Sequence, residues 1–296
     1  MNKGILYTII TALLFVTLEP VSKLIAQDVH PFVITFYRFA IGSLLLLPFA
    51  ITKMRKTKLR LTFKDLGIMT LLGILFICVS MIILQVGVKM AESPSTVAII
   101  FSFNSVLTIL FAIPVLKEKV TLPKCIALIL GVAGVLIGGD FFSGVRLASV
   151  LCAVFSALTF SLYVVLCRKL TKNIDVSIQS CVVFMTGSLV LLIMLLVMRI
   201  DVLPTFTPSV LTTLGYLGIF VTGIGYLGYF KAMEKGGTIM ASLAFFIKPV
   251  LTPFVTWIIN GVVPNGRVFI SVALIVAASY FAAFFKKKNA PAIKKV

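Results

Sequence analysis

The chain has 296 residues, of which 60% are hydrophobic and only 12% are charged, and its mean hydropathy is +1.16. A soluble domain of this length needs more charged surface, so the composition excludes an ordinary soluble enzyme or binding domain. The formal net charge is +18, but the cations lie in short links between apolar runs and not on one polar face, which excludes a nucleic-acid-binding protein.

Apolar runs follow one another along the whole chain, each of about 20 residues, the length that a helix needs to cross ~30 Å of hydrocarbon. The runs lack the alternation that is typical of barrel strands. They predict an all-α integral membrane protein with ten transmembrane helices. The predicted helices are 4–26, 31–52, 66–88, 95–116, 123–139, 147–167, 176–198, 209–230, 238–259 and 268–285.

The positive charges predict the orientation of these helices. Of the 27 Lys and Arg residues, 20 lie in segments on the same side of the membrane as the N-terminus, and 4 lie in segments on the other side. Because positively charged links stay in the cytoplasm, we expect both termini there. We expect a multi-pass protein of the cell (plasma) membrane of a bacterium.

The sequence also repeats itself. The segment 42–47, GSLLLL, returns as GSLVLL at 187–192, and NSVLT at 104–108 returns as KPVLT at 248–252. These matches divide the chain into a first repeat, 1–142, and a second repeat, 143–296, with five helices each. Five is an odd number, so the second repeat enters from the opposite side of the membrane, and the two repeats are inverted copies. Such repeats place a substrate site near the middle of the membrane, where the two halves meet.

Short motifs of the first repeat carry a resemblance to a known family. The segment 36–42 reads FYRFAIG, the segment 116–118 reads LKE, and a glycine-rich run, GVAGVLI, follows at 131–137. Together with Lys23 and the duplication, these motifs resemble the drug/metabolite transporter superfamily, in its EamA-like ten-helix branch. The resemblance implies transport of small metabolites and a cavity lined mainly by helices 1, 3, 4, 6, 8 and 9. The sequence departs from the family pattern at Phe15-Val16, where Trp-Gly is frequent, and at Val262, where a Glu is expected.

Lys248 is the most informative single residue, because ionisable groups inside membrane spans are costly and mark functional sites. It lies near the middle of the ninth predicted helix, and the repeat pairs it with Asn104 in the fourth. Pro249 and Pro253 leave nearby backbone carbonyls without their helical partners. We expect Lys248 and Asn104 at the centre of a cavity, with Lys248 binding a substrate anion or exchanging a proton. The alternative is a structural ion pair with Glu19.

Three further charges lie within the predicted spans. Glu19 precedes Pro20 in the first helix, and Lys23 lies one turn further on, so Glu19 can pair with either Lys23 or Lys248. A buried Glu19 could carry a proton or recognise a cation. We interpret Arg38 as a structural charge near the outer face that pairs with a carboxylate or a lipid headgroup, and Lys23 as a second structural charge whose amine reaches the interface.

Four uncharged residues complete the predicted substrate site, namely Gln85, Ser102, Tyr163 and Tyr226. The GxGxxG motif at 223–228 lies inside an apolar span without a preceding strand, so it does not predict nucleotide binding. The five cysteines contain no CxxC and the chain has one histidine, so no metal site and no cofactor are predicted. Gly134 and Gly138 form a GxxxG motif, which predicts close packing within one chain or in a homodimer.

These patterns predict a secondary transporter that works by alternating access and not an enzyme. The excess of cations within the spans favours a small polar substrate that is amino-acid-like or another carboxylate or zwitterion. The alternatives are a lipid-carrier flippase subunit and a membrane-embedded lipid-modifying enzyme, which would need a catalytic constellation that the sequence lacks. The expected partners are the small-molecule substrate and membrane lipids.

Overall fold

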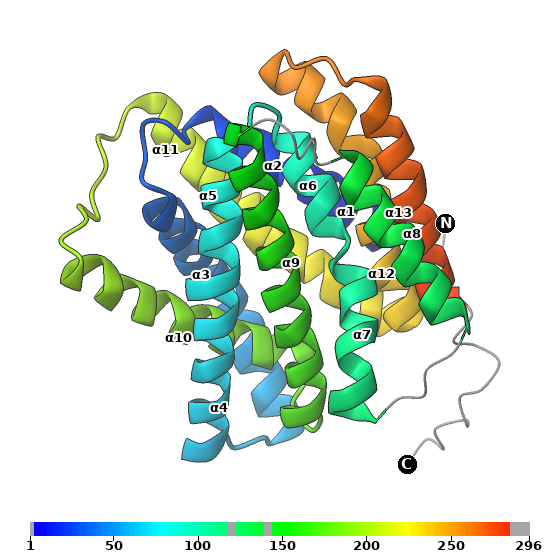
Figure 1. The fold of residues 1–296 in the computed structure, drawn as a ribbon. Coiled ribbons are helices and arrows are strands. Elements are labelled where there is room, and N and C mark those ends of the chain that lie inside the picture. The colour runs from blue at the N-terminus through cyan, green and yellow to red at the C-terminus, as the bar shows by residue number, and fades with distance from the viewer. Residues whose placement is uncertain (1–2, 118–121, 139–143, 285–296) are drawn as a thin grey trace.

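The computed structural model describes residues 3–117, 122–138 and 144–284 (Figure 1). Every regular element in these ranges is helical, and they contain no strand. Seven helices are long and apolar enough to cross a membrane, and two shorter apolar helices, Cys125–Gly138 and Gly266–Phe281, accompany them. The predicted class, an all-helical membrane protein, agrees with this architecture.

The helices of the first half run from blue to green in Figure 1. They are α1 (Lys3–Val16), α2 (Leu18–Leu24), α3 (Pro31–Thr57), α4 (Phe63–Gly73), the π-helix η1 (Ile74–Met81), α5 (Ile82–Met90), α6 (Pro94–Ser102), α7 (Asn104–Leu116) and α8 (Leu122–Gly138). Those of the second half are α9 (Gly144–Leu170), α10 (Val176–Val197), α11 (Pro208–Gly215), the π-helix η2 (Tyr216–Ile224), α12 (Gly225–Asn260) and α13 (Gly266–Phe284).

Helix starts follow local capping chemistry. Thr62 and Asp65 form a capping box at the start of α4, Asp175 caps α10, and Thr207 caps α11 ahead of Pro208. Each cap accepts a hydrogen bond from a backbone N–H that the first turn cannot satisfy within the helix. These caps fix where the spans leave the polar links.

The link predicted between the eighth and ninth helices is helical in the structure, because no proline interrupts the backbone between residues 225 and 248. The chain nevertheless folds back there. The ring of Phe15 lies 5.2 Å from that of Tyr226 and 5.7 Å from that of Phe245, whereas a straight helix would separate residues 226 and 245 by about 28 Å. Helix α12 therefore has two arms that both pack against α1, and the second arm returns toward the end of the molecule where α2 lies (Figure 1).

The packing partners of the first half mirror those of the second half. Helix α3 packs against α10, and α8 packs against α13. Helix α1 packs against α12, and in the same way α9 packs against η1, α5, α6 and α7. The two π-helices also follow corresponding helices, η1 after α4 and η2 after α11. Each half of the chain thus contributes the same kind of element to the same kind of contact.

Glycines allow the closest helix crossings. A Cβ on Gly73 would lie 2.7 Å from the carbonyl oxygen of Val183 and 3.0 Å from the amide nitrogen of Gly187, so α4 and α10 meet backbone to backbone. Gly134 and Gly138 of α8 face α13, and the hydroxyl of Ser271 donates to the carbonyl of Gly134 at 2.7 Å. The GxxxG face is therefore occupied within the chain.

We predict that Gly73→Ala destabilises the fold. The added methyl group meets backbone atoms that cannot rotate away, so the apparent free energy of unfolding should fall by about 1–3 kcal/mol. Gly67 lies on the same helix, and a Cβ added there would have no atom within 4 Å, so Gly67→Ala should be neutral or slightly stabilising. Thermal unfolding of the purified variants in detergent measures both, and equal stability of the two would contradict the close crossing.

Candidate functional site

The centre of the site is a buried ion pair between the two halves of the chain. The Nζ atom of Lys248 on α12 donates to Oε1 of Glu19 on α2 at 2.6 Å, across 229 residues of sequence. The side chain of Glu19 is 0% exposed and that of Lys248 is 5% exposed. The pair resolves the alternative that the sequence left open, because Glu19 contacts Lys248 and not Lys23.

Both helices lose backbone hydrogen bonds to prolines where they meet in this pair. The first span breaks at Thr17, between α1 and α2, because Pro20 has no N–H to donate to the carbonyl of Val16. On α12, Pro249 and Pro253 remove two further backbone donors directly after Lys248. Irregular backbone of this kind is tolerated inside a membrane where it is covered by protein or lines a polar cavity.

A second cation lies near the pair. The guanidinium of Arg38 donates from Nε to the hydroxyl of Thr222 at 3.0 Å and stacks 4.7 Å from the ring of Phe39. It is 4% exposed and close enough to Glu19 to interact with its charge. Arg38 is thus a buried charge that lies near the carboxylate of Glu19, and its partner Thr222 belongs to the π-helix η2. Its place near the outer face stays a prediction. The hydroxyl of Thr222 in turn bonds the carbonyl of Leu217, five residues earlier.

Lys23 does not contact Glu19 in this way but binds the end of a neighbouring helix. Its amine donates to the carbonyls of Val88 at 3.1 Å, of Lys89 at 2.9 Å, and of Ala91. These are the last carbonyls of α5, which lack partners within the helix. Lys23 thus caps α5 and joins it to α2, which supports its interpretation as a structural charge.

Asn104 and Ser102 flank the ion pair through Phe101. The ring of Phe101 lies 5.5 Å from Nζ of Lys248, and the amide of Asn104 donates to the carbonyl of Phe101 at 2.7 Å. Asn104 begins α7 after a break at Phe103, and its own carbonyl accepts a hydrogen bond from Ser161 at 2.9 Å. The hydroxyl of Ser102 donates to the carbonyl of Ala98. Both predicted residues lie beside Phe101, with their side chains bonded to backbone carbonyls of α6.

The remaining predicted residues are all inside the protein. Tyr163 is 7% exposed and stacks on Phe76 with 4.5 Å between the ring centroids. Tyr226 lies against Phe15 at 5.2 Å and against Phe184 at 4.9 Å. Gln85 on α5 is buried, and its Nε2 has no hydrogen-bond partner among the residues that the structure describes.

An aromatic cluster that sequence patterns do not predict surrounds the charges. It joins residues from several helices by ring contacts of 4.5 to 6.5 Å. Its members are Phe15, Phe39, Phe76, Phe101, Phe160, Tyr163, Phe184, Tyr226, Tyr229 and Phe245. The chain has 25 phenylalanines, and in an apolar helix an inward-facing one has the same sequence signature as one that faces lipid.

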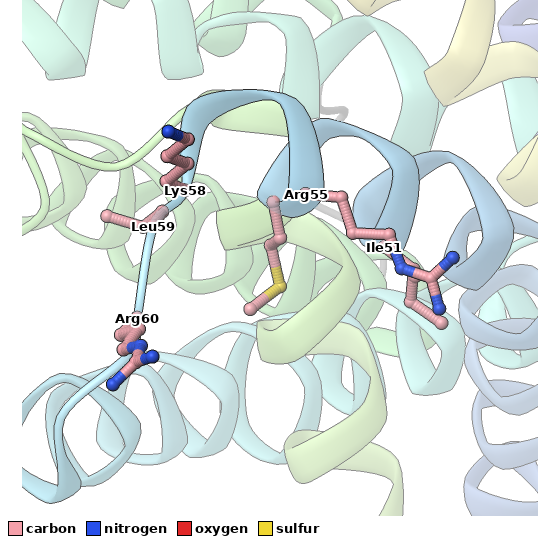
Figure 2. A pocket seen from close by; sticks show the side chains of 6 residues that line it. Ile51, Arg55, Lys58, Leu59 and Arg60 are labelled. Atoms are coloured by element: carbon pink, nitrogen blue, oxygen red, sulfur yellow. The ribbon is translucent and has the colours of Figure 1, made fainter.

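Two surface hollows lie away from the pair. One, of about 460 Å³, is lined by the end of α3 and the following link; Figure 2 shows Arg55, Lys58 and Arg60 around it. The other, of about 200 Å³, lies between the α5–α6 link, the ends of α8 and α9, and the α12–α13 link. The charges of the first hollow belong to the basic link between α3 and α4.

Comparison with known proteins agrees with a membrane transporter. The sequence profile of the EamA-like transporter family matches residues 2–138 and again residues 147–284. The chain therefore belongs to the EamA-like transporter family, and the resemblance to the drug/metabolite transporter superfamily is confirmed. It is a multi-pass membrane protein of the transporter class.

The relatives are bacterial. A protein named "uncharacterized transporter" of Clostridium kluyveri is 32% identical over 100% of this chain and 97% of its own length. The uncharacterized transporter YvbV of Bacillus subtilis is 28% identical over 79% of this chain and 76% of its own length. A solved crystal structure, 18% identical, superposes with a TM-score of 0.69 over 98% of this chain and 99% of the other, which shows a shared fold.

We predict that the ion pair behaves as a unit in unfolding experiments. Glu19→Gln or Lys248→Met alone leaves one charge buried without its partner, which should lower the free energy of unfolding by about 3–5 kcal/mol. The double variant removes both charges and should regain most of that loss. A double-mutant cycle from thermal or denaturant unfolding measures the coupling; additive losses would contradict a closed pair.

Proposed function

We propose that the protein is a secondary transporter of the drug/metabolite type in the plasma membrane of a bacterium. It moves a small polar metabolite, an amino-acid-like or other carboxylate or zwitterion, by alternating access. Its ten transmembrane helices form two inverted repeats, 1–142 and 143–296, and both termini are cytoplasmic. The double match to the family profile, the mirrored helix packing and the distribution of Lys and Arg support this arrangement.

The observation that carries the proposal is the buried pair of Glu19 and Lys248, one from each repeat. Burying two charges costs free energy that their attraction barely recovers, and well-packed apolar residues would stabilise the contact as well or better. Charges that persist at such depth in a membrane protein mark substrate or ion pathways. The pair thus supports a transport site between the repeats.

The chemistry of the pair matches a zwitterion. A substrate carboxylate can replace Glu19 as the partner of Lys248, and a substrate ammonium can replace Lys248 as the partner of Glu19. The aromatic cluster offers a wall for an apolar group and faces that attract cations. Binding in this way breaks the direct contact between the repeats, so that one repeat is free to move against the other. The pair then closes the molecule whenever no substrate is bound.

We expect the pair to be required for transport beyond its part in stability. After a thermal-shift screen against metabolite classes has named a ligand, uptake into proteoliposomes should fall by at least tenfold for Glu19→Gln, for Lys248→Met and for the double variant. A structural pair predicts the opposite for the double variant, which removes both charges of the pair and leaves Arg38 bonded to Thr222. Transport at the wild-type rate by the double variant would therefore overturn the proposal.

A second ion pair provides the matched control. Lys53 and Asp175 also join the two repeats, at 3.3 Å, but both are about one-third exposed. Partial burial raises the pKa of Asp175, but hydrogen bonds from Ser177 and Lys53 outweigh it and hold the pKa below its ordinary value, so Asp175 is ionised at neutral pH. An exposed pair contributes about 0–1 kcal/mol. The variant Lys53→Met with Asp175→Asn should fold and transport like the wild type.

A further inference from the structure

Polar side chains recur on every turn of the second arm of α12. Lys248, Thr252, Thr256 and Asn260 are spaced four residues apart, so each lies beside the next on the helix surface, and the row winds about 120° around the helix from the first to the last. We call these four residues the polar stripe; it is about 18 Å long at the helical rise. An amphipathic face is unexpected in a helix that is otherwise surrounded by apolar contacts.

The polar stripe packs against α2, and two hydrogen bonds fix its ends. Lys248 meets Glu19 at 2.6 Å, and the amide of Asn260 donates to the carbonyl of Pro20 at 3.2 Å. Thr252 and Thr256 lie between Lys248 and Asn260 along α12, and both are 0% exposed. The stripe therefore runs from the ion pair to the end of α12 inside the protein.

Four polar atoms along this seam have no hydrogen-bond partner among the described residues. They are Oε2 of Glu19, Oγ of Ser22, Oγ1 of Thr256 and Oδ1 of Asn260. Glu19, Ser22 and Thr256 are each 0% exposed. Buried polar atoms are almost always bonded, to protein or to ordered water, and a series of them at intervals of one turn is the lining that a chain of bound water requires.

A hollow adjoins the far end of the seam. It has a volume of about 200 Å³, and Val262, Val263 and Pro264, which follow Asn260 in the chain, line it together with Ala91. The volume has room for several water molecules at ~30 Å³ each. The polar stripe thus ends beside a hollow at the surface and begins at a carboxylate with a free oxygen.

We propose that the seam between α2 and the second arm of α12 binds a chain of water that joins Oε2 of Glu19 to the surface beside the α12–α13 link. Its ligands are water and hydronium. The proposed topology makes this the outer surface, and in that respect the inference rests on the proposed function. Thr256 is the residue that positions the water molecules, since its unpartnered hydroxyl lies about halfway along the proposed water chain.

The path gives Glu19 a source of protons. When a substrate that carries a carboxylate but no ammonium takes Lys248 away, the carboxylate of Glu19 loses its direct ion-pair partner. A hydronium in the seam then gives its proton to Oε2 and remains as water, so that uptake of an anionic group and of a proton are coupled.

The charged and titratable neighbours of Glu19 come from several elements. Lys248 faces it from α12, and Arg38 interacts with it from α3. Lys23 lies on α2 together with Glu19 and is bonded to carbonyls at the end of α5. The cation of α5 itself is Lys89. Tyr216 of η2 is bonded to Thr17, and α6 and α11 carry no titratable residue. Lys248, Arg38, Lys23 and Lys89 are therefore the cations that these elements bring near Glu19.

Two matched threonines test for bound water. The hydroxyl of Thr252 donates to the carbonyl of Lys248 at 2.7 Å, whereas that of Thr256 has no partner in the described structure. In a dry seam, Thr256→Val removes an unsatisfied hydroxyl and should raise the melting temperature by about 2 °C or more relative to Thr252→Val. With bound water the hydroxyl is satisfied, and we expect no such rise. A rise would overturn the inference.

Access from the outside is tested with silver ion, which bonds thiolates and is small enough for a single file of water. Thr256→Cys, Thr252→Cys and Phe254→Cys are each prepared in sealed vesicles, exposed to external silver, denatured and alkylated, and the blocked sites are identified by mass spectrometry. Phe254 is 43% exposed on the side of α12 that faces away from the seam. We expect external silver to protect the cysteines at 252 and 256 from alkylation and to leave the cysteine at 254 unprotected. Because residue 254 lies at the same depth in the membrane as the other two, depth alone would then not explain the protection.

The outcomes separate this inference from the transport proposal. Protection at neither threonine site, or at 256 alone, overturns a path that reaches Glu19. Both measurements are made without substrate, so a wet seam in a protein that fails every uptake assay would refute the transport proposal and leave the water path standing. A dry seam in a protein whose substrate uptake depends on Glu19 would refute the water path and leave the transport proposal standing.

Discussion

A carboxylate and an amine held 2.6 Å apart in the apolar interior constrain the rest of the structure. The two groups come from opposite ends of the chain, so the pair forms only when the two halves have come together. Because an isolated charge at this depth costs several kcal/mol, neither half can bury its own member stably without the other. The ion pair is thus both a contact between the halves and a reason for them to stay in register.

The surrounding helices are interrupted at the level of this pair. The first span breaks at Thr17, the fourth at Phe103, and α12 carries two prolines directly after Lys248. Asn104, which follows the break in the fourth span, is the repeat counterpart of Lys248. The interruptions bring polar backbone groups and polar side chains to the same place. The mirrored π-helices act in a similar way on the other side, where the widened turn of η2 presents Thr222 to Arg38.

Much of this could be predicted from the sequence, because hydropathy depends on segment length and composition and not on tertiary contacts. The apolar runs predict the membrane class, and the cost of buried charge singles out Glu19 and Lys248. The partner of Glu19 could not be predicted, since Lys23 lies one turn away and satisfies the same helical spacing. Only the packing of α5 shows that Lys23 is engaged by the carbonyls of Val88, Lys89 and Ala91.

The sequence is least informative where a side chain's direction decides its role. Arg38 is expected beside a carboxylate or a headgroup, and its burial could not be predicted, because helical periodicity in an almost wholly apolar segment does not distinguish a lipid-facing side from a buried one. The phenylalanines of the aromatic cluster escape prediction for the same reason. The polar stripe could have been found, since its spacing of four residues is visible in the sequence, but its meaning depends on α2 packing against it.

The central claim is that the ion pair closes the molecule and that substrate separates it. Solid-state NMR of the protein in lipid bilayers can measure the distance between the nitrogen of Lys248 and the carboxylate carbon of Glu19. We predict direct contact without ligand and clear separation at saturating concentrations of a transported ligand. A distance that stays unchanged when such a ligand is bound would contradict the account.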